Sequence, residues 1–205
     1  TPYLQRPLEL GADAVVYSAT KYLGGHSDLL MGSVATNDAA LAERLRFLLN
    51  AAGAVPGPFD SWLLLRGLKT LGWRMRAHSA NAARVAAWLR THDKVERVYW
   101  PGFEDFPNHD VATRQMSAAG EPLYGGMVSF EAASEEEALR ICQATKLFFL
   151  AESLGGVESL IEHPGKMTHA SLAGSGMEVP GALVRLSVGI EHVDDLIGDL
   201  DRALG

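Results

Sequence analysis

The chain has 205 residues but only one cysteine, Cys142. A single thiol cannot form an intrachain disulfide, so the fold must depend on its hydrophobic core, and a reducing, cytoplasmic environment is expected. We interpret Cys142 as a small buried side chain rather than a reactive thiol. Long apolar runs are also lacking. Runs such as 62–65 and 147–151 are far shorter than the roughly 20 residues that cross a bilayer. The sequence therefore predicts a protein with no membrane partner.

Positive charge is scarce as well. The chain has 18 Lys and Arg against 25 Asp and Glu, which gives a net charge of −7. Nucleic-acid binding needs a basic face, so this balance argues against such a partner. Hydrophobic residues make up 47% of the chain, enough for the core of one large or two small domains. Because the chain starts at Thr1 rather than at a methionine, we interpret it as the C-terminal portion of a longer protein.

In the first part of the chain, hydrophobic periodicity predicts a mixture of helices and strands. We expect a helix that stops at Gly11, with Gly72 as a helix breaker. The domain boundary is placed close to Gly72, which divides the chain into domains 1–74 and 75–205. The predicted helices cover residues 1–10, 38–52, 58–71 and 75–89, and the strands cover 13–17, interpreted as buried, and 31–36.

In the remainder of the chain, strands outnumber the helices that connect them. Ser134 followed by Glu137 has the spacing of a capping box that opens a helix. This alternation favours an α+β layer domain. The predicted strands cover residues 95–100, 126–131, 147–151 and 183–188, and the helices cover 108–116, 134–145 and 192–204.

Lys21 stands in the segment Ser18-Ala-Thr-Lys-Tyr-Leu-Gly-Gly-His-Ser-Asp28, directly after an apolar run. A lysine amine is normally protonated, but partial burial beside a cofactor favours its nucleophilic form. Ser18 and Thr20 are two positions apart, so in an extended backbone their hydroxyls would point the same way and could hold a phosphate. Pyridoxal 5'-phosphate (PLP) offers an aldehyde to the lysine and a phosphate to the hydroxyls. For an isolated motif of this kind, a solvated loop lysine is the alternative.

This segment resembles the lysine segment of the Cys/Met-metabolism family of PLP-dependent enzymes. Five further segments resemble signatures of the family in the expected order: Ala54-Val-Pro-Gly-Pro-Phe-Asp60, Arg66-Gly-Leu-Lys-Thr-Leu71, Ala151-Glu-Ser-Leu-Gly-Gly-Val-Glu-Ser159, Met167-Thr-His-Ala-Ser171 and Val184-Arg-Leu-Ser-Val-Gly189. The resemblance implies an α/β PLP-dependent transferase fold of the aminotransferase type (fold type I). The chain would hold the end of the large cofactor domain and the α+β C-terminal domain. It also implies that Lys21 is the catalytic Schiff-base lysine and that Ser18 and Thr20 bind the phosphate.

The last predicted strand carries one arginine, Arg185, among apolar residues. A buried arginine needs an anionic partner, and its planar fork suits a carboxylate. Arg185 could therefore pair with a local Asp or Glu. The resemblance implies instead that it holds the α-carboxylate of an amino-acid substrate, with Ser153 close to that carboxylate and to Lys21. It also implies that Thr168 supports this site by hydrogen bonding. Glu152 would face the distal ammonium of a substrate such as cystathionine, unless it is a solvated loop carboxylate.

Two other kinds of site are not favoured. His26, His163 and His169 lack a second His or Cys at ligand spacing, so we predict structural roles for them and no metal site. Residues 22–27 contain a Gly-Gly pair but lack the spacing of a nucleotide phosphate loop.

The resemblance also implies a reaction. The aliphatic Leu154 is expected of family members that act at Cγ, because a bulky aromatic residue is expected there in β-lyases. Segments 54–60 and 167–171 look closer to lyases. We therefore predict a cystathionine γ-lyase, which releases cysteine, 2-oxobutanoate and ammonia. Cystathionine γ-synthase and then methionine γ-lyase are the alternatives, together with a non-catalytic C-terminal fragment that serves subunit assembly. A homotetramer built from dimers with shared active sites is also implied.

Overall fold

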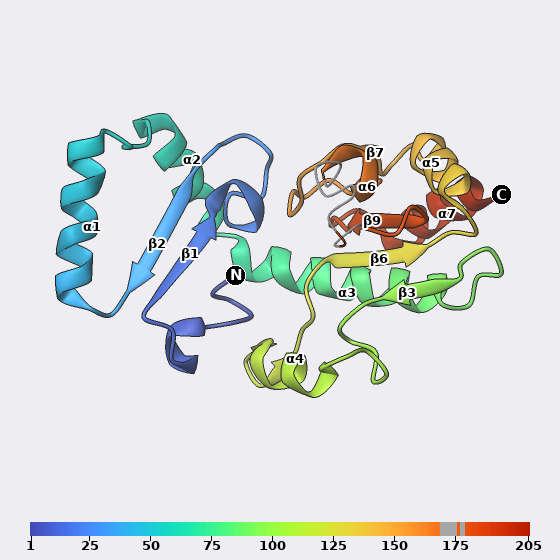
Figure 1. Ribbon diagram of the computed structural model, residues 1–205, viewed down its shortest axis with the longest axis horizontal. Helices are drawn as coiled ribbons and strands as arrows, with labels where there is room; N and C mark the ends of the chain where they lie inside the picture. The colour runs from blue at the N-terminus through green and yellow to red at the C-terminus, as the bar shows by residue number, and fades with distance from the viewer. Residues whose placement is uncertain (169–175, 177–178) are drawn as a thin grey trace.

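The computed structural model describes residues 1–168, 176 and 179–205. Its elements form two groups that are connected by the long helix α3 (Leu71–Leu89) (Figure 1). The first group contains a two-stranded sheet and two helices. The second group contains a five-stranded sheet with helices packed against it. This mixed α/β arrangement agrees with the predicted fold class.

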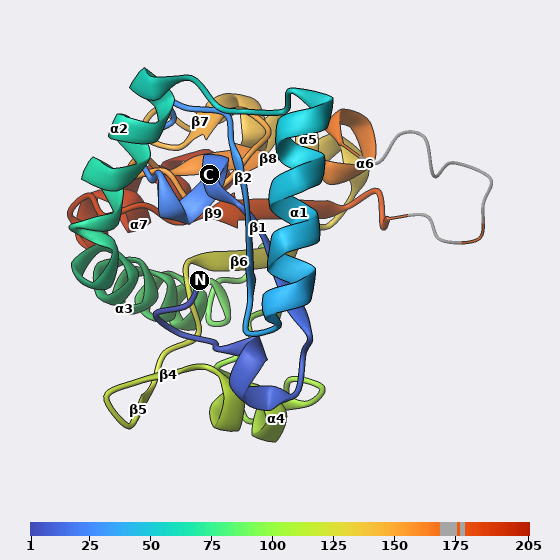
Figure 2. The same ribbon diagram turned by 90° about the vertical axis from the view of Figure 1, so that its left-hand side faces the viewer.

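In the first group, β1 (Ala14–Ser18) pairs antiparallel with β2 (Gly32–Thr36). A five-residue π-helix, η2 (Ala19–Leu23), follows β1 directly. Helix α1 (Ala39–Ala52) lies beside the sheet, and α2 (Pro58–Leu68) leads into α3 (Figure 2). Both strands and α1 were predicted, and the Asp38 carboxylate caps α1 by accepting hydrogen bonds from the amides of the next turn.

Two predictions for this group were wrong. A helix over residues 1–10 does not form; only Pro7–Leu10 makes one 3-10 turn (η1), which ends at Gly11. Pro7 has no N–H to donate, and a residue that precedes proline is disfavoured in helical conformation. Strand β1 is also not buried, since the side chain of Val16 is 77% exposed. The sheet has two strands, and only one of its faces packs against a core cluster.

The predicted helices on either side of Gly72 both form, but the break between them lies at residues 69–70, so Gly72 falls in the first turn of α3 (Leu71–Leu89) instead of separating the helices. One glycine costs a helix about 1 kcal/mol, which tertiary packing can offset. The ring of Tyr3 packs against this position so closely that a Cβ at Gly72 would lie 2.8 Å from it. The proposed domain boundary at residue 74 therefore falls inside a continuous helix.

The five-stranded sheet of the second group has the order β3–β6–β9–β8–β7, and only β7 and β8 are parallel. Helices α5 (Glu135–Ala144) and α7 (Val193–Leu204) pack together with α3 and the sheet, as expected of an α+β domain (Figure 1). The predicted strands and helices all form, with shorter bounds. The strands are β3 (Arg97–Tyr99), β6 (Met127–Glu131), β7 (Phe149–Leu150), β8 (Leu160–Glu162) and β9 (Leu183–Ser187), and the smaller elements are α4 (His109–Gln115), α6 (Pro164–Met167), β4 (Ser117–Ala118) and β5 (Glu121–Pro122).

Among these elements, β8, α6, β4 and β5 were not predicted, and each has four residues or fewer. At the start of α5, the Ser134 hydroxyl accepts a hydrogen bond from the Glu137 amide, as a capping box requires. The Glu137 carboxylate bonds Arg140 instead of returning to the cap.

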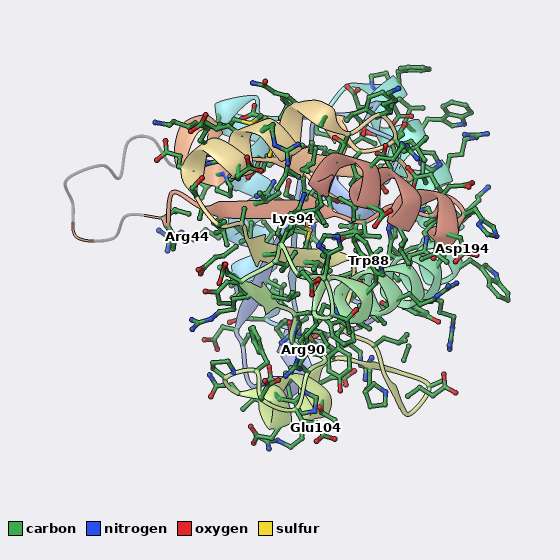
Figure 3. All side chains as sticks on the ribbon, turned by 90° about the vertical axis from the view of Figure 1, so that its right-hand side faces the viewer. Arg44, Trp88, Arg90, Lys94, Glu104 and Asp194 are labelled. Atoms are coloured by element: carbon green, nitrogen blue, oxygen red, sulfur yellow. The ribbon has the colours of Figure 1, made fainter. Side chains whose placement is uncertain are left out.

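Helix α3 contributes to two separate hydrophobic clusters. Its first turns, with Leu71 and Met75, pack with Leu4, Ala19 and Leu23. Its later turns pack against the five-stranded sheet, together with α5 and α7. The end of α3 reaches the face shown in Figure 3, where Trp88 and Arg90 are labelled. Helix α3 therefore packs against both the Lys21 segment and the sheet that carries Arg185.

Cys142 is 2% exposed on α5, and burial raises the pKa of its thiol to about 12. Only the thiolate reacts readily with disulfide reagents. We expect the native protein to react with 5,5'-dithiobis(2-nitrobenzoate) at pH 8 far more slowly than the protein in denaturant. Absorbance at the thionitrobenzoate band measures this, with free cysteine as the control. A native rate close to that of free cysteine would contradict the burial.

Among the described residues, no helix combines the length and the apolar character needed to cross a membrane.

Candidate active site

Lys21 lies in η2 at the end of β1, rather than in a loop. The backbone of Lys21 departs from helical values (φ −88°, ψ −132°), so the π-helix is kinked at this residue. Single π-turns occur frequently at functional sites. The Lys21 side chain is partly buried, and its amine donates a hydrogen bond to the Ser153 hydroxyl over 2.7 Å.

The geometric reason given for pairing Ser18 with Thr20 was wrong. Ser18 ends β1 and is exposed, whereas Thr20 already belongs to the helix, so the two residues do not alternate along one extended strand. The Thr20 hydroxyl accepts a hydrogen bond from the amide of Met31 at 3.0 Å. Part of its bonding capacity is therefore used to hold the residue that precedes β2. A role for both hydroxyls at a phosphate stays a prediction.

Ser153 belongs to a glycine-containing turn that follows β7. Its φ of +90° is unusual for a residue with a side chain, and such conformations cost about 1–3 kcal/mol and cluster at functional sites. Two residues later, Gly155 has φ +80°, and a Cβ there would lie 2.6 Å from the Tyr22 amide nitrogen. The turn thus packs directly against the residue after Lys21, which explains how Ser153 reaches the amine.

Arg185 lies on β9 and joins the same group of side chains. Its guanidinium donates from Nη2 to the Ser153 carbonyl oxygen at 2.7 Å. It also forms an ion pair from Nη1 to Glu162 Oε1 at 3.0 Å. The sequence left two alternatives for Arg185, an ion pair with a local carboxylate or a position next to the Lys21 segment. Both features are present in the structure. Ser153 links them, because its hydroxyl contacts Lys21 and its carbonyl contacts Arg185.

Glu162 is 1% exposed and stands directly opposite Arg185 in the register of β8 and β9. Its Oε1 also accepts a hydrogen bond from the Thr168 hydroxyl at 3.2 Å. A buried carboxylate that loses its partner destabilises a protein strongly, so this pair fixes the guanidinium in place. Thr168 is thus connected to Arg185 through Glu162, and its supporting role at the carboxylate site stays a prediction.

For Glu152 and the histidines, the structure gives fewer contacts that bear on a function. Glu152 is exposed beside Ser153, so its proposed contact with a distal ammonium stays a prediction. His26 bonds the Gly24 carbonyl. His163 is buried, accepts from the Lys166 amide and donates to the Gly181 carbonyl, which is consistent with the structural role predicted for it. His169 lies outside the described residues. Across the described part of the chain, no group of His, Cys, Asp or Glu has the arrangement of a metal site.

Behind Lys21 lies a buried aromatic pair that the sequence analysis did not identify. The ring of Tyr22 meets the ring of His78 edge-on, with centroids 5.2 Å apart. Burial raises the pKa of Tyr22 to about 12, so its phenol stays neutral. The pKa of His78 is lowered, mainly by burial, and its ring N–H donates to the Val188 carbonyl at 2.7 Å. This neutral pair connects the lysine segment to α3 and to the end of β9.

Two further signals in the sequence could have been used. Glu162 directly follows the apolar residues Leu160 and Ile161, so a strand there could bury it, and a buried carboxylate needs a cation. The arginine of α3, Arg74, falls among apolar helix positions that face the core, and it is 4% exposed. Arg74 bonds Thr70 within its own helix. Its contact with the Tyr22 carbonyl and the ion pair of Glu162 with Arg185 join distant positions, so those partners could be identified only in three dimensions.

The residues present fit PLP. A lysine amine lies within hydrogen-bond distance of a hydroxyl and, through Ser153, next to a guanidinium. The backbone of Ser153 is held in a rare conformation that brings these groups together. A nucleophilic amine and a carboxylate-binding cation beside it are the groups that an enzyme acting on amino acids with PLP requires.

Comparison with known proteins agrees with this geometry. The family described as Cys/Met metabolism PLP-dependent enzyme matches residues 1–205. The chain belongs to this family. Cystathionine gamma-synthase of Mycobacterium tuberculosis is 57% identical over 206 residues, which covers 100% of this chain and 52% of that protein. Cystathionine beta-lyase of Lactococcus lactis is 53% identical over 207 residues and is covered to 53%.

Solved structures give the same result. The crystal structure of metB from Corynebacterium glutamicum superposes with a TM-score of 0.95 at 51% identity, and cystathionine gamma-lyase from yeast with 0.91 at 47%. Both matches cover 100% of this chain and 52% of the solved chain. The fold type and the family predicted from the sequence are therefore confirmed. The chain spans about half the length of the relatives it matches.

Proposed function

We propose that this chain carries the lysine and the substrate-carboxylate site of a PLP-dependent trans-sulfuration enzyme that acts at Cγ of cystathionine-type amino acids. The carrying observation is the connected group Lys21, Ser153 and Arg185, drawn from η2, the turn after β7 and β9. A non-catalytic fragment would not need a lysine amine held against a serine in a strained backbone. This favours the enzyme over the subunit-assembly alternative.

Each residue has a separate task in the proposed reaction. PLP, when bound, supplies the carbonyl and the electron sink. Lys21 would hold the cofactor through its amine, and the same amine would move protons at Cα and Cβ of the substrate. Arg185 orients the substrate by its α-carboxylate, and Glu162 and Thr168 keep the guanidinium in place. Ser153 connects the two groups, since its hydroxyl accepts a hydrogen bond from the Lys21 amine and its carbonyl accepts one from Arg185.

The first candidate reaction is γ-elimination of cystathionine, which gives cysteine, 2-oxobutanoate and ammonia. Leu154 next to Ser153 and the exposed Glu152, which could meet the distal ammonium, support action at Cγ. The second candidate is γ-replacement, in which cysteine displaces the activating group of a homoserine ester. It is supported by the relatives named cystathionine gamma-synthase at 55–57% identity.

Product analysis of the full-length protein with PLP tests both candidates. Release of 2-oxobutanoate from cystathionine would establish elimination at Cγ, and cystathionine formed from an activated homoserine ester and cysteine would establish replacement. Pyruvate with homocysteine would instead indicate β-elimination, and methanethiol from methionine a methionine γ-lyase. A colourless protein with none of these activities would contradict the proposal.

We further propose that residues 1–74 complete a PLP-binding domain and that residues 75–205 form the domain that binds the substrate carboxylate. The two hydrophobic clusters that share α3 support this division.

A homotetramer built from dimers with shared active sites is proposed for the whole protein. Exposed aromatic side chains on α2 and α3, Phe59, Trp62 and Trp73, are compatible with buried contacts in such an assembly. Sedimentation of the full-length protein would test it.

Replacing both Ser18 and Thr20 with alanine should weaken PLP binding by at least about tenfold, because two hydrogen bonds to a phosphate contribute roughly 1.5–3 kcal/mol each. Titration of the apo-protein with PLP, followed by absorbance, measures this. T20A alone also removes the bond to Met31, so its thermal stability serves as the control. Unchanged PLP affinity in the double variant would exclude the phosphate role.

A further inference from the structure

Arg74 is a buried cation that forms no ion pair with any residue the structure describes. Its side chain emerges from α3 and is 4% exposed. Within residues 1–168, 176 and 179–205, no carboxylate forms an ion pair with it, whereas Arg185 on β9 has Glu162. A charge that is removed from water destabilises a fold unless hydrogen bonds replace its hydration. The partners of the Arg74 guanidinium therefore define what this residue does.

Three of its four partners are backbone carbonyls, and two of these directly follow Lys21. Nη1 donates to the Tyr22 carbonyl at 2.7 Å, and Nη2 donates to the Leu23 carbonyl at 3.3 Å. Nη2 also donates to the Gly67 carbonyl at 2.9 Å, near the end of α2. The remaining bond runs from Nε to the Thr70 hydroxyl at 3.1 Å. One planar guanidinium thus joins η2, α2 and α3, as only a forked donor can.

The two carbonyls that follow Lys21 are the ones that a helix end leaves without an intrahelical partner. The amides of Gly24 and Gly25 return to the carbonyls of Ala19 and Lys21 at 2.9 and 2.8 Å. Arg74 satisfies the Tyr22 and Leu23 carbonyls in between. A cation at a helix C-terminus is also favoured by the direction of the peptide dipoles.

The chain after the helix is shaped around this guanidinium. Gly25 has φ +75°, and a Cβ at this position would lie 2.0 Å from Arg74 Nη1. No side chain fits there, so the close approach of backbone and guanidinium requires glycine. On its other side, η2 directs the Lys21 amine to Ser153. The helix is therefore fixed from behind by Arg74, while the amine faces the candidate site.

We propose that Arg74 is a positioning residue for Lys21: by binding the carbonyls of Tyr22 and Leu23 it holds the kinked π-helix in the conformation that presents the amine. The inference rests on the proposed role of Lys21 for its effect on catalysis. Its structural half, that Arg74 orders the helix, does not depend on PLP or on any reaction.

Hydrogen exchange and kinetics of R74M and R74K in the full-length protein test both halves. Methionine fills similar space without donors, and lysine keeps the charge but not the fork. We expect exchange to accelerate in peptides that cover residues 19–25 of the apo-protein, while peptides from α7 are unchanged. With PLP, kcat should fall by at least about tenfold, because a displaced reacting group lowers the rate steeply, whereas KM should change little.

R84M is the matched control, because Arg84 lies on the same helix but is exposed and pairs with Asp194, which is labelled in Figure 3. It should leave exchange in residues 19–25 and kcat unchanged. If R74M does not fold, R74K is judged by the same two measurements. Normal exchange in residues 19–25, or a raised KM at an unchanged kcat, would overturn the proposal. Failure of unmodified protein to bind PLP would overturn the proposed function instead, and the exchange result would still decide the role of Arg74.

Discussion

Replacement of Lys21 by alanine is expected to abolish turnover in the full-length protein. The amine is the only lysine nitrogen bonded to Ser153 among the described residues, and Ser153 connects it to Arg185, the proposed carboxylate-binding residue. Loss of the proton transfers alone should lower kcat by about 10²–10⁴-fold, and loss of covalent capture should lower it further. Activity assays and borohydride fixation of PLP, followed by peptide mass analysis, measure the two effects together.

K69A provides the control for this experiment. Lys69 is an exposed lysine at the end of α2, so its removal changes the charge equally without touching the site. It should keep both turnover and the fixed cofactor. If the K21A protein still carried PLP in borohydride-stable linkage at another lysine, the assignment of Lys21 would be wrong.

Arg185→Lys should raise KM for the amino-acid substrate by at least about tenfold with a smaller change in kcat. A bidentate, charge-assisted contact to a carboxylate contributes roughly 1.5–3 kcal/mol, and an ammonium cannot reproduce the planar fork. The lysine would retain the charge opposite Glu162, so the protein should remain folded. Steady-state kinetics and a thermal melt separate binding from stability.

The matched control is R202K. Arg202 also pairs with a buried carboxylate, that of Asp199, but its own side chain is 60% exposed on α7. This change tests whether loss of any arginine fork beside a buried acid affects catalysis, and KM should stay at the wild-type value. An R185K protein with unchanged KM would show that Arg185 serves only Glu162 and Ser153.

Much of the fold could be predicted because its signals are local. Strand β1, helix α1 and helix α7 each follow from apolar periodicity. Asp38 marks the start of α1 and Ser134 the start of α5, because each side chain accepts hydrogen bonds from amides of the first helical turn. The wrong predictions had two kinds of cause. The helix over residues 1–10 fails locally, at Pro7. The other cause is tertiary: the Tyr3 ring lies against Gly72 where a Cβ would clash with it, and Val16 on β1 is exposed among the described residues.

The candidate site shows the same division. The sequence by itself determined the chemical groups: a lysine after a strand, an arginine in an apolar strand, and motifs that together identify the family. Only the tertiary structure decided that Ser153 connects Lys21 to Arg185, that Glu162 neutralises the guanidinium, and that Arg74 binds the helix behind the lysine. Hydrogen bonds and ion pairs act over about 3 Å, and these partners are separated by 23 to 132 positions along the chain. Their meeting is fixed by sheet register and helix packing, which no local pattern encodes.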